Sequence, residues 1–455
     1  MNIDQIVEDQ RGFFKTDATK PLEYRLAALK KLRAVIKKNE ANIYAALKDD
    51  LNKSEFESYM TEIGMVYEDL SFQEKHLPKW IKPQRVRTPL AQFHARSFVI
   101  SEPYGVALIM SPWNYPFLLT ISPLIAAIAA GNCAVVKPSA YSPRTTQVIA
   151  DIVAECFPPE YVTVVQGGRN ENAALLEQRF DYIFFTGSVA VGRLVMEKAA
   201  KYLTPISLEL GGKSPCIIDK SADLKLAAKR LAFGKLVNAG QTCIAPDYLF
   251  VHKEVKEELV VYLQQHITEM LGSSPLDNPD FPSIINEKQF NRLVSLIDQE
   301  NVLFGGKTRG VRQIEPTLLD NITAESKIMQ EEIFGPILPI MTYSSIDEVV
   351  DYVVSHEKPL ALYLFTGDKA VEKRILSSVS FGGGCINDTI VHIATSYMGF
   401  GGVGNSGTGA YHGKKSFETF THQKSVMKRY NWIDLPMKYH PYQQKYLKLI
   451  KGFLR

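Results

Sequence analysis

Cys243 lies in a run of small and amide residues where its thiol could act as a nucleophile. Residues 222–236 have the pattern of a helix, and residues 247–252 that of a strand. A cysteine on the connection between them can be directed into a cleft, because loops held by a rigid scaffold often carry the chemistry of a site. Free cysteine is also a common small core residue, and Cys243 taken alone favours that second interpretation.

Two polar residues, Glu209 and Asn114, lie at the ends of apolar, strand-like runs. The carboxyl group of Glu209 is either solvated or held in a partly dry cleft, where its pKa would rise to suit a general base. Asn114 lies between two prolines, and its fixed side-chain N–H could stabilise an oxyanion, although asparagine is equally common in turns. Each residue alone leaves both interpretations open.

Two glycine-containing turns are candidates for phosphate binding. Gly187 and Ser188 end a strand-like run and open a helix-like one, which presents free N–H groups to a phosphate. The full dinucleotide fingerprint is missing, so a plain strand–helix turn is an equal alternative. Residues 212–214 resemble the end of a nucleotide-hydrolase loop, but Ser207 stands where that loop needs glycine and Pro215 follows where a helix should begin. We reject that interpretation.

The composition excludes several classes of protein. The chain has 455 residues, with 52 basic and 49 acidic side chains and a net charge of +3, so bulk charge gives no argument for nucleic acid. The odd number of widely spaced cysteines, without a C-x-x-C pair, argues against a disulfide framework and a metal site. It favours a reducing compartment, and the first residues show no signal-peptide pattern, so we expect a cytoplasmic protein. Four cysteines are expected to be structural: Cys133, Cys156, Cys216 and Cys385.

The order of elements predicts an α/β fold. Strand-like and helix-like runs alternate between residues 104 and 210 and again between 214 and 387. Continuous apolar strands alternating with helices indicate parallel sheets covered on both faces, with ligands bound beyond the carboxyl ends of the strands. Residues 4–79 have the spacing of amphipathic helices.

Three segments need separate interpretation. The charge-free run 117–136 is long enough to span a membrane, but Pro123 and Gly131 interrupt it, so we expect a buried helix and then a strand. Residues 93–101 resemble an exposed strand arm that pairs with another part of the chain or with another subunit. After residue 388 the chain looks irregular up to about residue 416.

Eight short motifs stand in a characteristic order along the chain: Pro112–Pro116 (PWNYP), Val136–Ser139 (VKPS), Phe185–Ser188 (FTGS), Leu208–Lys213 (LELGGK), Gly240–Cys243 (GQTC), Glu332–Pro336 (EIFGP), Gly401–Gly407 (GGVGNSG) and Tyr411–Gly413 (YHG). Each motif alone is unspecific, but their shared order and spacing make the joint match highly specific. Through these motifs the chain resembles the aldehyde dehydrogenase superfamily from about residue 15 to 430, most closely its class 3 and fatty-aldehyde branch.

The resemblance implies a role for each matching residue. Cys243 would be the nucleophile that forms a thiohemiacetal and then a thioester, Glu209 the general base, and Asn114 with the Cys243 backbone N–H the oxyanion hole. It implies no metal. The implied NAD or NADP site comprises Lys137, Ser139, Gly187, Ser188, Glu332, Phe334 and Trp113, and the implied substrate pocket includes Tyr115 and His412.

The resemblance also implies the domain organisation. Two parallel-sheet, Rossmann-like domains would face each other across a cleft: an NAD(P)-binding domain from residues 1–84 and 102–209, and a catalytic domain from residues 210–388. An oligomerisation and bridging region from residues 85–101 and 389–430, with a small β arm, would support a homodimer. Residues 431–455 would form a basic C-terminal helix.

One departure from the family pattern concerns the cofactor. After Lys137 and the two residues that follow it, the family commonly has a glutamate that binds the ribose hydroxyls and repels a 2′-phosphate, and this chain has Ala140. Without that carboxylate, an NADP phosphate meets less repulsion. We therefore expect NADP to be accepted, alone or beside NAD.

The basic C-terminal segment leaves two alternatives open. Residues 435–455 contain no acid, and lysines share one helical face of residues 444–455. Such a helix either makes weak contact with a membrane surface or packs on its own subunit or a partner, and we favour packing.

The activity itself has three alternatives. A cofactor-independent thiol esterase would leave Lys137 and Glu332 without a purpose. A CoA-acylating relative would not need Glu209. A non-catalytic binding protein would not need Cys243 or Asn114. We therefore expect the oxidation of medium-chain, long-chain or aromatic aldehydes to carboxylic acids.

Overall fold

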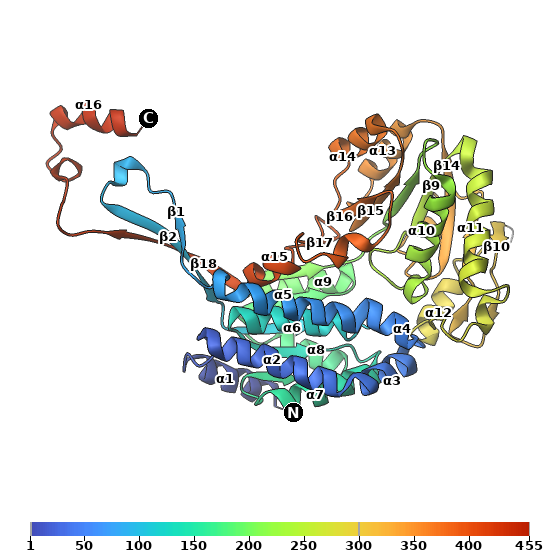
Figure 1. The fold of residues 1–455 in the computed structure, drawn as a ribbon, viewed down its shortest axis with the longest axis horizontal. Helices are drawn as coiled ribbons and strands as arrows, with labels where there is room; N and C mark the ends of the chain where they lie inside the picture. Colours follow the sequence, from blue (N-terminus) through green and yellow to red (C-terminus); the bar gives the residue numbers. More distant parts are fainter. Residues whose placement is uncertain (1, 299–300, 455) are drawn as a thin grey trace.

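The computed structural model describes residues 2–298 and 301–454, which form two mainly parallel sheets and a projecting arm (Figure 1). The first sheet has the strand order β17-β7-β6-β3-β4-β5, and the second has the order β10-β13-β14-β9-β8-β15-β16. The arm is a three-stranded sheet with the order β1-β2-β18. The prediction of an α/β protein with two parallel-rich sheets is therefore confirmed.

The carboxyl ends of the parallel strands lie together at one edge of the first sheet. Its parallel strands are β3 (Val106–Met110), β4 (Cys133–Lys137), β5 (Val162–Val164), β6 (Tyr182–Thr186) and β7 (Ile206–Glu209). The sequence places Lys137, Thr186 and Glu209 last in their strands, so parallel pairing brings them to the same edge. Ligands bind at this edge of open parallel sheets.

Helices surround the first sheet. The charge-free run resolves into the buried helix α6 (Leu118–Ala130) and strand β4, as expected, and Gly131 ends the helix with a positive φ of 92°. Among the described residues, no helix is long and apolar enough to cross a membrane. The other helices of this half are α1 (Ile3–Phe14), α2 (Leu22–Lys38), α3 (Glu40–Leu51), α4 (Glu55–Ser58), α5 (Gly64–Trp80), α7 (Pro143–Cys156), α8 (Arg169–Leu176) and α9 (Val189–Ala200).

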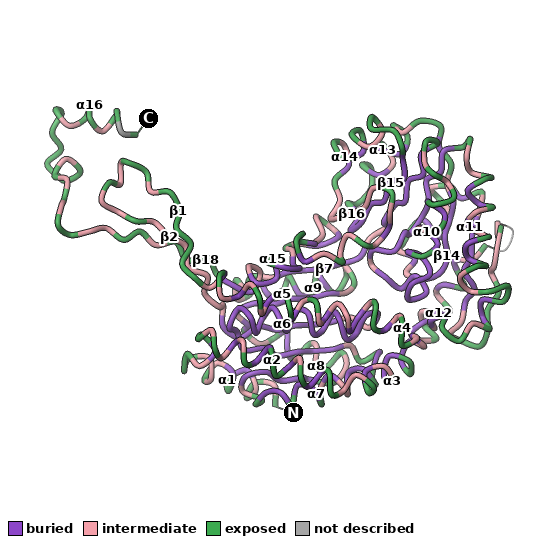
Figure 2. The backbone as a smooth tube through the Cα atoms, viewed as in Figure 1, coloured by how far each residue is buried: buried purple, intermediate pink, exposed green. Residues whose placement is uncertain are grey.

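The second sheet is also parallel except at one edge, where β10 (Val302–Phe304) pairs antiparallel with β13 (Thr317–Leu319). Most residues of its central strands are buried, which explains their continuous apolar sequence (Figure 2). The remaining strands are β8 (Pro215–Ile218), β9 (Tyr248–His252), β14 (Ile337–Tyr343), β15 (Ala361–Phe365) and β16 (Gly383–Ile386). The helices are α10 (Leu224–Leu236), α11 (Lys256–Leu271), α12 (Glu287–Val294), α13 (Ile346–Ser355) and α14 (Lys369–Ser378).

The arm projects away from both sheets and is mostly exposed (Figures 1 and 2). The strand expected at 93–101 is β2 (Ala95–Pro103), and it pairs within the chain with β18 (Thr421–Arg429) and β1 (Gln84–Val86). The sequence analysis did not predict β18, because its side chains are mostly exposed and polar and show no apolar alternation.

The segment 389–430, expected to form part of the oligomerisation and bridging region, is divided between two places. Its β17 (Gly407–Thr408) pairs antiparallel with β7 and so joins the first sheet beside Glu209. The short helix α15 (Gly413–Thr419) then leads into β18. Only the last part of the segment lies in the arm.

The C-terminal helix is shorter than the expected span 431–455. It is α16 (Gln444–Phe453), because Pro436 and Pro441 disfavour helix in the preceding residues. It lies at the far end of the arm (Figure 1). Its Leu449 and Ile450 line an apolar cavity of about 690 Å³ together with Leu90 of the arm.

Candidate active site

A tight turn after helix α10 carries Cys243. The backbone of Asn238, Ala239 and Gly240 is left-handed, with φ of 52°, 50° and 71°. At Gly240 a Cβ atom would lie 2.3 Å from the carbonyl oxygen of Gly335, so only glycine fits. Left-handed non-glycine residues cost about 1–2 kcal/mol each and persist where the surroundings enforce them, often at functional sites.

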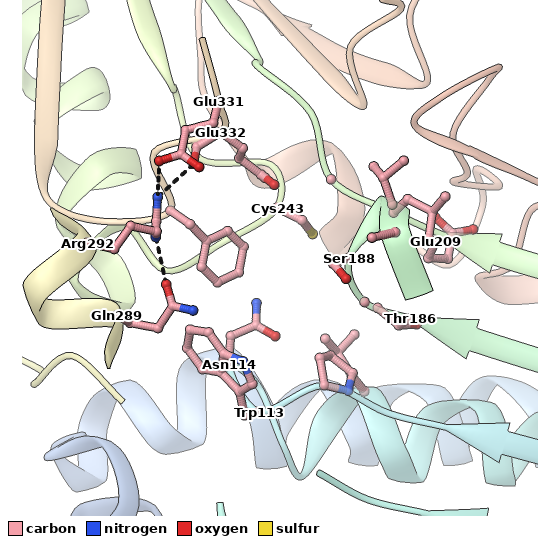
Figure 3. A pocket seen from close by; sticks show the side chains of 18 residues that line it. Trp113, Asn114, Thr186, Ser188, Glu209, Cys243, Gln289, Arg292, Glu331 and Glu332 are labelled. Atoms are coloured by element: carbon pink, nitrogen blue, oxygen red, sulfur yellow. Dashed lines mark hydrogen bonds and ion pairs between the residues drawn. The ribbon is translucent and has the colours of Figure 1, made fainter. Parts of the chain in front are cut away.

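Cys243 lines two separate cavities. The first has a volume of about 600 Å³ and is lined by both polar and apolar side chains, and Figure 3 shows the Cys243 sulfur inside it. The second has about 210 Å³ and is almost entirely apolar. Leu119 at the start of α6 also lines both cavities. The thiol therefore stands where a polar chamber meets an apolar one.

Glu209 shares the first cavity with Cys243, as the proposed chemistry requires. The residue is 3% exposed, and neither carboxylate oxygen has a hydrogen-bond partner among the described residues. Burial raises the pKa of the Glu209 carboxyl well above its ordinary value. A dry, unpartnered carboxyl group that gains a proton easily is suited to accept one from a neighbour.

The thiol of Cys243 is protonated in this environment. Burial, and to a smaller extent the negative charges of Glu332 and Glu209, raise its pKa to about 12. The sequence left two possibilities, a lowered thiol pKa or proton transfer to Glu209. The raised pKa of the thiol favours the second possibility, transfer of its proton to a neighbouring base.

Asn114 connects the loop after β3 to the cysteine turn. It is 2% exposed, and its side-chain Nδ2 donates a hydrogen bond of 3.0 Å to the Gln241 carbonyl oxygen. Its backbone oxygen accepts a hydrogen bond of 2.8 Å from Nδ2 of Asn238. Since an amide nitrogen carries two hydrogens, Asn114 keeps one donor beyond the bond to Gln241.

Five of the residues expected to bind the dinucleotide line the first cavity: Trp113, Gly187, Ser188, Glu332 and Phe334. Ser188 is the N-cap of α9 and makes no side-chain capping bond, so the N–H groups of this helix start remain available to a phosphate. The rings of Trp113 and Phe334 lie 5.3 Å apart. The buried Oε1 of Glu332 has no partner among the described residues. Free donors, an unpartnered carboxylate oxygen and two aromatic rings fit a dinucleotide.

Lys137 and Ser139 lie outside the lining of that cavity, at the end of the neighbouring strand β4. Nζ of Lys137 donates hydrogen bonds of 2.8 and 2.7 Å to the carbonyl oxygens of Pro138 and Gly167. Burial lowers the pKa of the Lys137 ammonium group. Ser139 accepts a hydrogen bond from the Tyr141 backbone through its hydroxyl group.

Tyr115 and His412, expected in the substrate pocket, both line the apolar cavity. The Tyr115 hydroxyl group and Oγ1 of Thr242 are 2.7 Å apart and share a hydrogen bond. Burial lowers the pKa of His412 to about 4, so its ring is neutral at pH 7.

The sequence analysis missed most of the residues that shape the two cavities. In the apolar cavity these include Met60, Met65, Leu118, Phe233, Val237, Ile390 and Ile393, which the sequence pattern cannot distinguish from core residues. In the polar cavity it missed Arg292, whose Nη2 donates a hydrogen bond of 2.6 Å to the Ile333 carbonyl oxygen and so supports the loop that carries Glu332. No motif surrounds that arginine.

Residues 1–426 match the aldehyde dehydrogenase family model. The chain belongs to this family and is an aldehyde dehydrogenase that uses NAD or NADP.

Two relatives are similar over nearly their whole length. The 4,4'-diaponeurosporen-aldehyde dehydrogenase of Staphylococcus aureus is 46% identical, covering 100% of this chain and 99% of its own. The dimeric NADP-preferring aldehyde dehydrogenase of Canis lupus familiaris is 42% identical, covering 94% of each chain. The substrate-bound structure of Staphylococcus aureus AldH superposes with a TM-score of 0.98 at 46% identity and covers all of both chains.

Proposed function

We propose that this enzyme oxidises apolar aldehydes, with a medium or long aliphatic chain or an aromatic ring, to carboxylic acids through a covalent intermediate on Cys243. One observation carries the proposal: Cys243 lines both an apolar cavity that fits such a chain and a polar cavity that contains Glu209. The carbonyl carbon would lie at the sulfur, with its apolar group in the second cavity.

The first step is attack of the Cys243 sulfur on the carbonyl carbon. The thiol proton passes to Glu209, directly or through a water molecule, because burial has raised the pKa of that carboxyl group. The thiohemiacetal oxygen becomes negative, and the free N–H of Asn114 together with the Cys243 backbone N–H stabilises it. Loss of one such donor typically costs about 2.7–4 kcal/mol.

The dinucleotide, when bound, supplies the acceptor for the hydride that leaves the tetrahedral carbon. Gly187 and Ser188 would hold its pyrophosphate at the start of α9, and Glu332 with Phe334 would hold the nicotinamide ribose and ring. Trp113 lies beside Phe334 and would complete that surface. Lys137 and Ser139 would hold the adenosine ribose.

The last step is hydrolysis of the Cys243 thioester. Water is a weak nucleophile and needs a base, and Glu209 is the carboxyl group without partners in this cavity whose raised pKa suits that task. Glu209 must first release the thiol proton to solvent. Its carboxylate then removes a proton from the attacking water, Asn114 stabilises the second oxyanion, and the proton on Glu209 passes to the sulfur that leaves. The carboxylic acid and the free thiol are the products.

The side chains of the apolar cavity support long or aromatic substrates. Besides Tyr115, His412 and the hydroxyl of Thr242, it presents mainly aliphatic and aromatic groups to the ligand. The relative from Staphylococcus aureus is named for 4,4'-diaponeurosporen-aldehyde.

The arm supports a homodimer. The strand β18 forms one edge of the arm sheet, and among residues 2–298 and 301–454 it pairs with one neighbour, β2. A free strand edge is suited to pairing with another subunit. The canine relative is named as dimeric. The free cysteines agree with a reducing, cytoplasmic location.

An aldehyde panel tests the proposal. Absorbance at 340 nm is followed with aldehydes of increasing chain length and with aromatic aldehydes, each with NAD and with NADP, in the presence and absence of CoA. We expect reduced cofactor to form without CoA, faster with apolar aldehydes than with short ones. Turnover only with CoA would indicate an acyl-CoA product, ester hydrolysis without dehydrogenase activity would indicate a thiol esterase, and no turnover would indicate a binding protein.

A further inference from the structure

An ion pair with no exposure to solvent lies beneath the loop that carries Asn114. Nζ of Lys53 and Oε1 of Glu62 are 2.6 Å apart, and both side chains are 0% exposed. Lys53 follows α3, and Glu62 lies in a π-helical turn, η1 (Tyr59–Ile63), between α4 and α5. Burying both charges costs free energy that their attraction often fails to recover, so stability alone is a weak reason for the pair.

The remaining contacts of the pair are directed at one loop. Nζ of Lys53 donates a hydrogen bond of 3.2 Å to the Asn114 carbonyl oxygen and lies 4.0 Å from the centre of the Tyr115 ring. Oε2 of Glu62 accepts hydrogen bonds from the backbone N–H groups of Phe117, at 2.9 Å, and Leu118, at 3.1 Å. The pair therefore holds the loop at its asparagine and at the start of α6.

The Asn114 peptide is fixed between this pair and the cysteine turn. Lys53 binds its carbonyl oxygen from one element, and Asn238 binds the same oxygen from the turn before Cys243. The Asn114 side chain in turn donates to Gln241 in that turn. A shift of the loop would therefore move the carboxamide relative to the sulfur, and displacements near 1 Å can cost about a hundredfold in rate.

We propose that Lys53 and Glu62 are positioning residues, which set the orientation of the Asn114 carboxamide toward the carbonyl oxygen bound at Cys243. This inference rests on the oxyanion role of Asn114 in the proposed function. Neither residue lines either cavity, so neither touches the substrate or the cofactor.

The first test separates positioning from stability. Removal of one partner, as in Lys53→Met or Glu62→Gln, leaves a buried charge unpaired and should lower Tm, whereas Lys53→Met combined with Glu62→Gln removes both charges and should restore most of it. We expect kcat/KM for the aldehyde to stay at least about tenfold below wild type in the double variant, because the Asn114 carbonyl has lost its ammonium donor. Recovery of kcat/KM together with Tm would overturn the proposal. If either single variant fails to fold, the double variant still decides.

The second test is a double-mutant cycle between Lys53 and Asn114. If Lys53 acts through Asn114, Lys53→Met should change kcat/KM by less than about twofold in the Asn114→Ala background, although it costs at least about tenfold in wild type. If the losses of kcat/KM in the two single variants multiply in the double variant, the proposal is overturned, whereas the role of Asn114 stands. Wild-type activity in the single variant Asn114→Ala would instead exclude the oxyanion role of Asn114. The present inference depends on that role and would then also be excluded.

A matched control uses another ion pair of the chain. Lys256 and Asp320 are 2.7 Å apart, each with 17% of its side chain exposed, at the start of α11 away from both cavities. Lys256→Met should lower Tm and leave kcat/KM within about twofold of wild type. A loss as large as that of Lys53→Met would show that any broken ion pair reduces activity, which would overturn the proposal.

Discussion

Glu332→Gln should stabilise the protein and weaken its activity. Burial and the charge of Asp247 raise the pKa of Glu332 to about 8, although the backbone of Gly212 and the cations Lys213 and Arg292 act in the opposite direction. The surroundings of Glu332 therefore disfavour the negative charge of its carboxylate. Glutamine keeps the shape and the acceptor oxygen but carries no charge, so the variant removes the electrostatic cost.

The sign of the effect depends on pH. Below about pH 4.5 the carboxyl group is protonated in both the folded and the unfolded chain, and it contributes nothing to the difference. Between 4.5 and 8 the unfolded chain releases its proton while the folded chain keeps it, so the folded state loses stability as pH rises. Above 8 the loss is constant. The difference between these pKa values corresponds to at most roughly 5 kcal/mol, and since Glu332 is partly exposed, we expect roughly 2–3 kcal/mol after solvent screening.

The assay compares Tm of the wild type and of Glu332→Gln at pH 5 and pH 8.5, together with kcat/KM for NAD and NADP. We expect nearly equal Tm at pH 5, a variant higher by a few degrees at pH 8.5, and a loss of roughly tenfold or more in kcat/KM for the cofactor, because a hydrogen bond to its ribose is weakened. A Tm difference that is the same at both pH values would refute the electrostatic reasoning. Unchanged kcat/KM would refute the cofactor role.

Three further predictions follow from the site and the arm. Glu209→Gln should lower kcat by about 10²–10⁴-fold, and restoration of turnover by an added small amine base would support its role in proton transfer, whereas wild-type turnover would exclude it. Since Ala140 replaces a carboxylate, NADP should support turnover; an NAD preference above about a hundredfold in kcat/KM, or roughly 2.7 kcal/mol, would contradict this. If the basic face of α16 contacts membranes, the full-length chain should co-sediment with anionic vesicles more than a chain ending at Asp434, and equal pelleting would reject the contact.

The sequence predicted best what depends on local pattern. The strands of both sheets are short apolar runs that end in polar residues, and parallel pairing then brings Glu209 and Lys137 to one edge without further information. Cys243 alone was weak evidence for a catalytic nucleophile. The order of the neighbouring motifs made that interpretation convincing. The prediction of the fold and of the chemical class therefore depended on short motifs and on their order in the chain.

What the sequence could not provide depends on contacts between distant segments. The residues of the apolar cavity come from several distant elements, among them η1, α5, α6, α10 and the loop after β16, and most of their side chains resemble those of core residues. The sequence pattern places Lys53 and Glu62 as two charged residues on amphipathic helices. The fold, however, buries both side chains completely. The strand β18 has no apolar alternation and is specified by its pairing with β2. Periodicity contains none of this information.

The environment of Cys243 also agrees with the proposed role of a carboxyl group as its proton acceptor. Burial raises the pKa of the thiol and that of Glu209 for the same reason, since each would become charged in a dry cavity. Transfer of the thiol proton to the Glu209 carboxylate keeps one negative charge in the cavity, whereas ionisation of the thiol with Glu209 already charged would create two. Proton transfer to Glu209 therefore largely avoids the cost of desolvating a second negative charge. The pH dependence of aldehyde attack should therefore follow the titration of Glu209, with activity lost as pH falls through its raised pKa, and this acid limb should disappear in Glu209→Gln.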